Sequence, residues 1–334
     1  MNLLDAMRYL SALAQARHFG RAAEACHITQ PALSNAIRAL EQEFGVTIVR
    51  RGRQYEGLTP EGERVLASAH RMLHEREALR QELGQARAAP GGPLLLACVP
   101  TALPVAARLV ARLRAAHPAL RPTLRSLSSP EIETGLEELS IDMALGYAER
   151  IEARGVRARV AASYRERHVL LRRRDLPGRG RARRVAPLRW REAAALPLGL
   201  LTPEMHNRHI VDAAFAQAGV AVRPVFETNS VLALLLAVTE GAVAASIMPG
   251  VLAGQARRDA QLEIVPLVEP EVTVTMGLLV PQGGRLSLAQ QAALGCVAEA
   301  GWWRETVDLG SAETADAVDA AAHHSSLLSD GSPT

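Results

Sequence analysis

The segment HITQPALSNAIRALEQEFGV, residues 27–46, predicts a helix that begins and ends within it. Thr29 is suited to the N-cap position, and Pro31 to the first turn, where backbone amides have no partner within the helix. Gly45 is suited to the C-terminal end, because glycine adopts the left-handed conformation at little cost. One side of this helix is apolar, with side chains that recur at spacings of four and three: Leu33, Ile37, Leu40 and Phe44.

The other side of the same helix carries amide, hydroxyl and guanidinium groups: Gln30, Ser34, Asn35 and Arg38. Such groups read base edges or hold phosphates in protein–DNA complexes. A helix that simply faces solvent would have the same polarity. A shorter helix over 20–26 precedes it across a three-residue turn. Two helices joined in this way form a helix-turn-helix, whose second helix can enter the major groove of DNA.

A short basic hairpin is predicted directly after this helix. Ile48 and Val49 begin it, and Tyr55 and Gly57 lie on its return, with three arginines in four residues near its tip: Arg50, Arg51 and Arg53. A basic hairpin beside a recognition helix can act as a wing that grips the phosphate backbone. The arginines alone could mark a solvated turn. Helix and wing in series favour a DNA-binding head over residues 1–58.

Composition limits the remaining classes of protein. The 334 residues, 48% hydrophobic and 22% charged, suit a globular protein of two or three domains. No apolar run is long enough for a membrane span, and the start has no basic region before an apolar one, so neither a membrane protein nor a secreted one is expected. Three widely spaced cysteines favour neither a disulfide framework nor a zinc site. We therefore expect a cytoplasmic protein with no metal and no cofactor.

A linker helix over residues 59–89 is predicted to follow the head. Apolar side chains recur there at alternating spacings of four and three, with Arg76 as a polar interruption: Val65, Ala69, Met72, Leu79 and Leu83. Such a heptad seam either packs on the chain's own core or pairs two subunits. The helix lies between two domains without a neighbour to bury it, so the second interpretation is favoured. The glycines and prolines of 84–93 suggest a hinge.

From residue 94 onward, predicted strands and helices alternate. Strands over 94–99, 123–127 and 141–145 are separated by helices over 104–116 and 130–139, and a second such set extends to about residue 280, followed by a helix over 288–300. This alternation implies a mostly parallel sheet flanked by helices.

Ligands bind such sheets beyond the carboxyl ends of the strands. Polar side chains predicted near those ends form a candidate site for a small anion or organic acid: Thr101, Ser128, Ser129, Tyr147, Thr202, Asn229 and Ser246. Each of them could instead be a helix cap.

The run FGRAAEACHITQPALSNAIRALEQEFGVTIVRRGRQYEGLTPEGERVL resembles the N-terminal winged helix-turn-helix of LysR-type transcriptional regulators. The matching positions are Phe19, Ala22, Ala23, Gln30, Pro31, Ala32, Leu33, Ser34, Ile37, Leu40, Glu41, Gly45, Val46, Arg51, Leu58, Thr59 and Gly62. The sequence departs from the family pattern at three packing positions of the head, Phe44, Val49 and Glu61. It also has Ala244 where the family's glycine-rich turn has its second glycine.

The resemblance implies an α+β, multi-domain fold with a winged helix-turn-helix, a long linker helix and an effector-binding domain over 90–303. That domain would have two subdomains, 94–162 plus 270–303 and 163–269, joined by two crossover strands like a small periplasmic binding protein. The implied protein is a non-enzymatic regulator that binds double-stranded DNA as a homodimer or homotetramer and responds to a small-molecule effector. Its DNA contacts would be Gln30, Pro31, Ser34, Asn35, Arg38, Arg50, Arg51 and Arg53. RNA polymerase is a further candidate partner.

Two other functions are less well supported by the sequence. An α/β enzyme would leave the head unexplained, and the chain has no P-loop, no G-x-S-x-G and no HExxH motif. A periplasmic binding protein would need a signal peptide. The arginine-rich segment 172–184 is either a solvated loop or a second nucleic-acid contact. The tail over 304–334, with His323 and His324, is expected to be disordered, and metal binding there is not expected.

Overall fold

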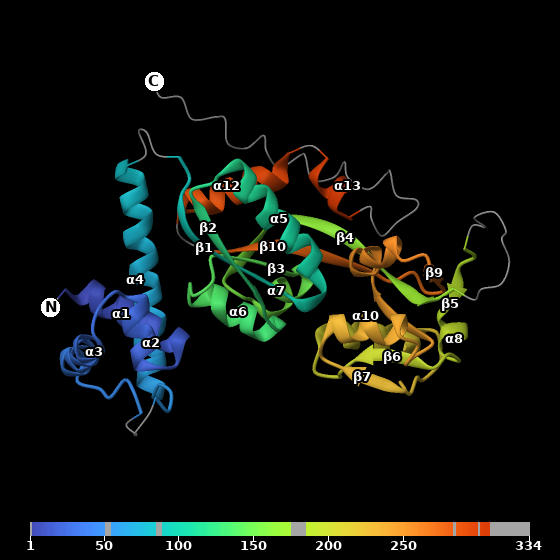
Figure 1. The fold of residues 1–334 in the computed structure, drawn as a ribbon, viewed down its shortest axis with the longest axis horizontal. Helices are drawn as coiled ribbons and strands as arrows, with labels where there is room; N and C mark the ends of the chain where they lie inside the picture. The colour runs from blue at the N-terminus through green and yellow to red at the C-terminus, as the bar shows by residue number, and fades with distance from the viewer. Residues whose placement is uncertain are drawn as a thin grey trace.

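The computed structural model describes residues 2–50, 55–84, 89–174, 185–282, 285–299 and 301–307. The N-terminal head comprises α1 (Leu3–Ala16), α2 (Phe19–Ala25) and α3 (Gln30–Phe44), and α4 (Pro60–Gly84) leads away from it toward the rest of the chain (Figure 1). The expected start and end of α3 are confirmed, since the Thr29 hydroxyl accepts from the Ala32 amide and Gly45 is left-handed, with φ of 65°.

The head has its own apolar core, to which every helix in it contributes. Fully buried side chains come from α1, from α3 and from the start of the wing: Met7, Leu10, Leu13, Leu33, Leu40 and Ile48. Phe44, expected on the apolar side of α3, is instead 40% exposed. It is the last residue of the helix, and its position extends past the core on which Leu40 packs.

The wing is anchored at its base as the sequence predicts. Val49 pairs with Leu58 in an antiparallel bridge, and the Arg50 amide donates to the Gly57 carbonyl oxygen at 3.0 Å. Two of the expected phosphate contacts, Arg51 and Arg53, lie outside the described residues. The wing therefore leaves α3 as a hairpin whose two ends are fixed.

Helix α4 divides into two halves with different environments. Leu66 and Ala69 belong to the core of the head, and Val65 packs against it. Further along, Met72 is 44% exposed and Leu79 is 54% exposed. The expected seam is thus corrected: the segment from Val65 to Ala69 packs on the chain's own head, because α1 lies against it, and the exposed part begins at Met72. The side chain of Leu83 lies outside the described residues.

The C-terminal part is one mixed sheet with the strand order β2-β1-β3-β10-β4-β8-β6-β7. Its first half contains β1 (Gly92–Cys98), β2 (Leu120–Ser126) and β3 (Met143–Tyr147), which are parallel. Helices α5 (Leu103–Ala116), α6 (Ser129–Glu137), α7 (Ala148–Arg154), α12 (Leu288–Ala298) and α13 (Trp302–Val307) accompany it, with the short 3-10 helix η1 (Pro100–Ala102) before α5.

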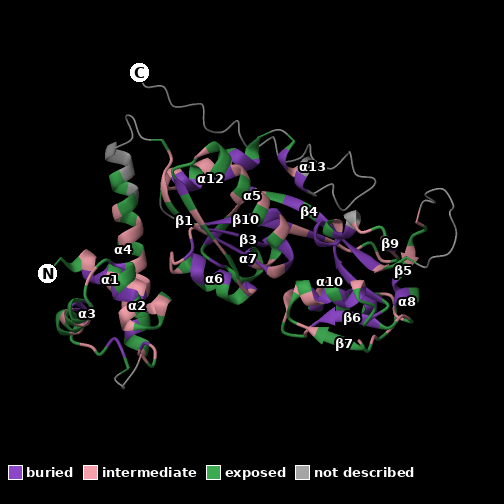
Figure 2. Ribbon diagram, viewed as in Figure 1, coloured by how far each residue is buried: buried purple, intermediate pink, exposed green. Residues whose placement is uncertain are grey.

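The second half contains β6 (Leu198–Leu201), β7 (Phe226–Thr228), β8 (Ala245–Pro249) and β9 (Leu262–Val268), with the two-residue β5 (Leu188–Arg189) beside β9. Its helices are α8 (Trp190–Ala193), α9 (His206–Gln217), α10 (Val231–Thr239), α11 (Gly250–Ala253) and η2 (Gly254–Arg258). Figure 2 shows buried residues gathered in the strands of both halves, which form separate cores.

Two long strands join the halves, as the family resemblance implies. Strand β4 (Ala158–Arg173) pairs with β10 (Thr273–Pro281) as far as Arg167 and with β8 from His168 onward. The sequence pattern predicts only a short strand over 168–171 in this region. The full length of β4 is missed because the run Arg165-Glu166-Arg167 is wholly polar in sequence, although Glu166 is only 3% exposed and faces the interior as a strand residue. Of the arginine-rich segment, residues 175–184 lie outside the described part of the chain.

Within the described residues, no helix combines the length and the apolar character that crossing a membrane requires.

Candidate DNA-binding and effector-binding sites

The polar face of α3 is open to solvent. Gln30, Pro31, Asn35 and Arg38 are exposed, whereas Ser34 is half-buried. The Arg38 guanidinium donates to the Asn35 side-chain oxygen at 2.8 Å, so both groups project from the same surface of the helix. Because Leu33, Ile37 and Leu40 fix the opposite face in the core, α3 presents these polar groups at a defined orientation. This arrangement suits a helix that enters the major groove.

Glu41 fixes the wing to this helix. Its carboxylate accepts from the Ile48 amide at 2.9 Å and from the Val49 amide at 3.3 Å. Hydrogen bonds to a charged group are stronger than those between neutral groups, so the strand that enters the wing is held against the C-terminal turn of α3. From the sequence, Glu41 is only a matching position of the family pattern, and its positioning role was missed.

The motif Leu58-Thr59-x-x-Gly62 joins the wing to α4. The Thr59 hydroxyl donates to the Thr47 carbonyl oxygen and accepts from the Gly62 amide at 2.9 Å. At Gly62 the backbones meet, because a Cβ built there would lie 2.2 Å from the carbonyl oxygen of Ile48. The threonine of this motif thus caps α4 and ties it to the wing strand, and only glycine leaves room for that strand.

A cleft of about 170 Å³ lies between the two halves of the C-terminal domain. Its lining comes from the segment after β1, the end of β3, helix α7, and the starts of α6 and α9: Val99, Pro100, Thr101, Ser128, Ser129, Pro130, Tyr147, Arg150, Arg154, Glu204, Met205, His206, Asn207 and His209. Four of the seven residues expected to bind effector are therefore brought together here, namely Thr101, Ser128, Ser129 and Tyr147.

Thr101 and Tyr147 form the floor of the cleft in the first half. Thr101 is only 2% exposed, and its hydroxyl lies 3.4 Å from the Tyr147 hydroxyl. Burial raises the pKa of Tyr147, so its hydroxyl stays protonated and can donate a hydrogen bond. Across the cleft, the ring of His206 meets the Tyr147 ring edge-on, with centroids 4.4 Å apart. This pair is a direct contact between the two halves.

Arg150 brings positive charge to the same place. Its guanidinium forms an ion pair with Glu133 at 2.6 Å, and its Nη1 lies 3.3 Å from Nδ1 of His206. Glu133 also lies 3.8 Å from Arg154. Burial lowers the pKa of His206 to about 4, and the nearby Arg150 guanidinium acts in the same direction. The imidazole is therefore neutral near pH 7.

Ser128 is engaged as a helix cap. Its hydroxyl donates to the Glu131 carboxylate at 2.6 Å, and its amide donates to the same oxygen at 2.8 Å. These bonds lower the pKa of Glu131. The capping alternative left open by the sequence therefore holds for Ser128, although its hydroxyl oxygen can still accept a hydrogen bond at the edge of the cleft.

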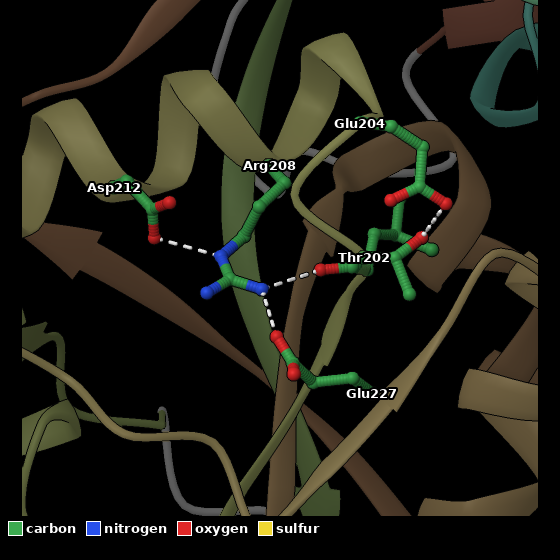
Figure 3. A network of polar contacts seen from close by, with 6 residues as sticks. Thr202, Glu204, Arg208, Asp212 and Glu227 are labelled. Carbon is green, nitrogen blue, oxygen red and sulfur yellow. Dashed lines mark hydrogen bonds and ion pairs between the residues drawn. The ribbon is translucent and has the colours of Figure 1, made fainter.

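The other three predicted effector residues lie outside the lining of the cleft. Asn229 is exposed after β7, and Ser246 is fully buried in β8. Thr202 follows β6, and its hydroxyl donates to the Glu204 carboxylate at 2.7 Å, as Figure 3 shows. Thr202 therefore contacts two lining residues without lining the cleft itself, Glu204 through its hydroxyl and Met205, whose amide donates to the Thr202 carbonyl oxygen at 3.0 Å.

Arg208, in the first turn of α9, fixes the position of this helix through its hydrogen bonds. Its guanidinium donates to the Leu201 carbonyl oxygen at 2.7 Å, to Glu227 at 2.5 Å and to Asp212 at 2.8 Å (Figure 3). These contacts tie the end of β6, strand β7 and α9 together. The turn that carries Glu204, Met205 and His206 into the cleft is thus held at both of its ends.

The charged, imidazole and amide side chains of the cleft were not predicted from the sequence: Arg150, Arg154, Glu204, His206, Asn207 and His209. Asn207 is buried, and its amide lies 2.9 Å from His168 Nε2 on the crossover strand β4. Each of these residues follows a strand end by about a turn or more, so a search for polar residues immediately after strands passes over them. No cluster of three His, Cys, Asp or Glu side chains that could hold a metal ion is present among the described residues.

Comparison with protein families decides the identity of the fold. Residues 4–63 match the model of bacterial regulatory helix-turn-helix proteins of the lysR family, and residues 87–302 match the LysR substrate binding domain. The chain belongs to the LysR family. Both the expected family and the expected combination of an N-terminal helix-turn-helix with a C-terminal binding domain are confirmed for this LysR regulator.

Curated relatives match part of this LysR chain. The hydrogen peroxide-inducible genes activator of Dickeya chrysanthemi is 40% identical over 104 residues, which is 31% of this chain and 34% of that protein. The SDS degradation transcriptional activation protein of Pseudomonas sp. (strain ATCC 19151) is 42% identical over 100 residues, 30% of this chain and 33% of that protein. The matched part thus spans about a third of the length of these relatives.

Solved structures match nearly the whole LysR chain. A full-length OxyR variant from Pseudomonas aeruginosa has a TM-score of 0.69 at 23% identity, covering 93% of this chain and 96% of that one. CbnR, a LysR family transcriptional regulator, has a TM-score of 0.59 at 19% identity, covering 92% and 99%. At these identities the likeness is one of fold.

Proposed function

We propose that this LysR protein binds promoter DNA through α3 and the wing, and that a small-molecule effector in the cleft controls this binding. The observation that carries the proposal is the exposed polar face of α3 beside a wing anchored by Glu41. Acting on chromosomal DNA would place the protein in the cytoplasm, and RNA polymerase is the partner that transcriptional control would require. A footprint on DNA flanking its own gene, with and without candidate metabolites, tests the proposal directly.

The effector is proposed to bind reversibly rather than to oxidise a thiol, although several relatives are named for hydrogen peroxide. The chain's three cysteines, Cys26, Cys98 and Cys296, are all buried. Burial raises the pKa of Cys98 to about 12 and also raises those of the other two. Thiolate character and exposure govern oxidation by peroxide, and these thiols have little of either. Neither the cleft nor the proposal requires a catalytic role.

Two single variants are expected to distinguish residues that read bases from residues that bind phosphates. Asn35→Ala should lower the preference for the operator by ~1–3 kcal/mol at one base pair, because the amide can read a base edge. Arg50→Ala should weaken all sequences alike and reduce the slope of log affinity against log salt by about one. Filter binding of operator and non-operator DNA over a salt series measures both effects. A uniform loss in both variants would contradict entry of α3 into the groove.

We propose a homotetramer built from dimers, because the chain offers two separate apolar faces for a second copy. One is the far half of α4, with Met72 and Leu79. The other, on the outer edge of the second half, consists of side chains from 36% to 63% exposed: Val225, Phe226, Leu232 and Leu236. Strand β7 pairs with β6 and ends the strand order there. Two faces of this kind are what a tetramer needs.

The double substitution Leu232→Asp and Leu236→Asp is expected to convert tetramers to dimers without abolishing DNA binding. Both side chains lie one turn apart on α10 and point to solvent, so the monomer should keep its fold. Analytical ultracentrifugation gives the mass. Arg165→Asp is the control, because Arg165 is exposed on β4 and the substitution changes the net charge by the same two units. This control should leave the mass of the oligomer unchanged. A tetramer in the double variant would exclude this face as an interface.

A further inference from the structure

The cleft between the two halves has an asymmetric distribution of charge and apolar surface. Val99, Pro100, Pro130 and Met205 supply apolar lining, while Arg150 and Arg154 supply two positive charges. Glu204 is the one acidic residue that lines the cleft in the described part of the chain, and its solvent-exposed carboxylate accepts a hydrogen bond from the Thr202 hydroxyl. A ligand that suits these walls combines a negative charge with a compact apolar part.

The room in the cleft restricts the size of that ligand. About 170 Å³ corresponds to the space of roughly six water molecules in the liquid. An engineered apolar cavity of about 150 Å³ accepts a benzene ring. A ligand with one ring or a short chain and one or two carboxylates therefore fits, whereas a nucleotide or a peptide does not.

His206 occupies the boundary between the halves and faces positive charge from several directions. Arg150 and Arg154 come from α7, and His209 comes from the next turn of α9. Tyr147 of β3 lies against its ring, and Glu204 precedes it in the same turn. His206 is also the first residue of the 12-residue helix α9, where the helix dipole opposes a cationic side chain.

We propose that the cleft binds a small organic anion whose carboxylate contacts both Arg150 and His206, and that His206 takes up a proton as the anion binds. The inference rests on the proposed effector site and names its ligand class and a residue that responds to it. Glu133 does not cancel the positive charge, because this single carboxylate already serves both Arg150 and Arg154. A bound carboxylate would offset the repulsion that keeps His206 neutral.

The direction of the pH dependence follows from this arrangement. In the free protein the pKa of His206 is lowered to about 4, by burial first and by Arg150 second. A neighbouring carboxylate favours the charged imidazolium and therefore raises this pKa on binding. Between the free and the bound pKa, binding is coupled to proton uptake, so affinity falls as pH rises through that window. Above the bound pKa, affinity no longer depends on this group.

Proton uptake would also couple binding to the arrangement of the two halves. Arg150 and Tyr147 belong to the first half and His206 to the second, so an anion that touches both sides holds them together. A ligand shifts such an equilibrium by its difference in affinity for the two arrangements. An imidazolium paired with a shared carboxylate supplies that difference, because it exists only when the anion bridges the cleft.

The test uses the full-length chain and three pairs of probes: acetate and acetamide, succinate and succinamide, benzoate and benzamide. Isothermal titration calorimetry in two buffers of different ionisation enthalpy measures affinity and the number of protons taken up. We expect at least one carboxylate to bind at least about tenfold more tightly than its amide, which is about 1.4 kcal/mol. Its affinity should fall with rising pH by at most about tenfold per unit, the limit for one proton.

Variants separate the two roles. His206→Gln should retain carboxylate binding but abolish its proton uptake, because glutamine keeps a hydrogen-bonding group without a titratable nitrogen. Arg150→Gln should weaken carboxylate binding at least about tenfold, and Arg150→Lys, which keeps the charge beside Glu133, should recover part of it. Arg114→Gln removes an exposed arginine at the end of α5, away from the cleft, and should bind as the parent does.

Three results would overturn the inference: no carboxylate of the panel binds at millimolar concentration, carboxylates and amides bind alike, or binding of the parent chain takes up no proton. DNA binding by the same preparations is measured in parallel. DNA binding without carboxylate binding would refute the anion site and leave the proposed regulator intact, whereas loss of operator binding in the parent chain would refute the regulator itself.

Discussion

Gly62→Ala is expected to destabilise the DNA-binding head by about 3 kcal/mol and to reduce its affinity for DNA. The added Cβ would lie 2.2 Å from the carbonyl oxygen of Ile48 and 3.0 Å from its carbonyl carbon. Both are backbone atoms, so no side chain can rotate away. Ile48 cannot shift easily either, because its amide is held by Glu41 and its carbonyl oxygen accepts from the Thr59 amide at 3.0 Å. Chemical denaturation of the variant measures the loss.

A second glycine provides the control for this experiment. Gly295 lies inside α12, is exposed, and a Cβ there would meet nothing within 4 Å. Gly295→Ala should therefore stabilise the chain by about 0.5–1 kcal/mol, the usual gain for alanine in a helix. If Gly62→Ala were as stable as the parent protein, the wing strand would not cross α4 as closely as the structure has it.

Much of the head could be predicted from the sequence because its determinants are local. The N-cap Thr29, the first-turn Pro31 and the terminal Gly45 act within a few residues of where they stand, and α3 begins and ends as they indicate. The tie between Glu41 and the wing strand could not be predicted in this way. It joins positions seven and eight residues apart across a change of direction, and only the packed head brings them together.

The cleft was harder to predict because its residues come from distant parts of the chain. Thr101 and Tyr147 were found from their places after strands, but Arg150 and His206 are 56 residues apart in sequence and meet across the two halves. Ser246, in contrast, was predicted to bind effector but does not line the cleft. It was placed near the end of a strand, whereas β8 continues to Pro249 and buries Ser246 in its interior.

The heptad seam shows why a repeat does not by itself identify its partner. Met72 and Ala69 both belong to the apolar repeat, yet Ala69 is fully buried against the chain's own head and Met72 is 44% exposed. The repeat continues through both environments, because each requires an apolar residue every three or four positions. Only the exposed half is available to a second subunit.

Met72→Asp together with Leu79→Asp is therefore expected to separate the subunits that pair through α4. The tetramer should fall to dimers joined at the face formed by β7 and α10, and DNA binding should be weak. The two side chains are 44% and 54% exposed in the single chain, so the substitutions should leave its fold intact. Buried across a dimer, each would contribute about 1.5–3 kcal/mol per subunit, and two charges in their place would lose this and repel their copies. Sedimentation equilibrium of the full-length chain measures the change in mass.

Loss of the pairing through α4 should reduce operator affinity far more than loss of any single contact does. A dimer binds its second half-site at the effective concentration set by α4, and losing that linkage costs about 10²–10⁴-fold in affinity. Arg80→Asp is the matched control, since it changes the net charge by the same two units at an exposed position beside the seam. If the control weakened binding as much as the double variant, charge near DNA would explain both results. If the double variant still sedimented as the parent does, the exposed half of α4 would not be an interface between subunits.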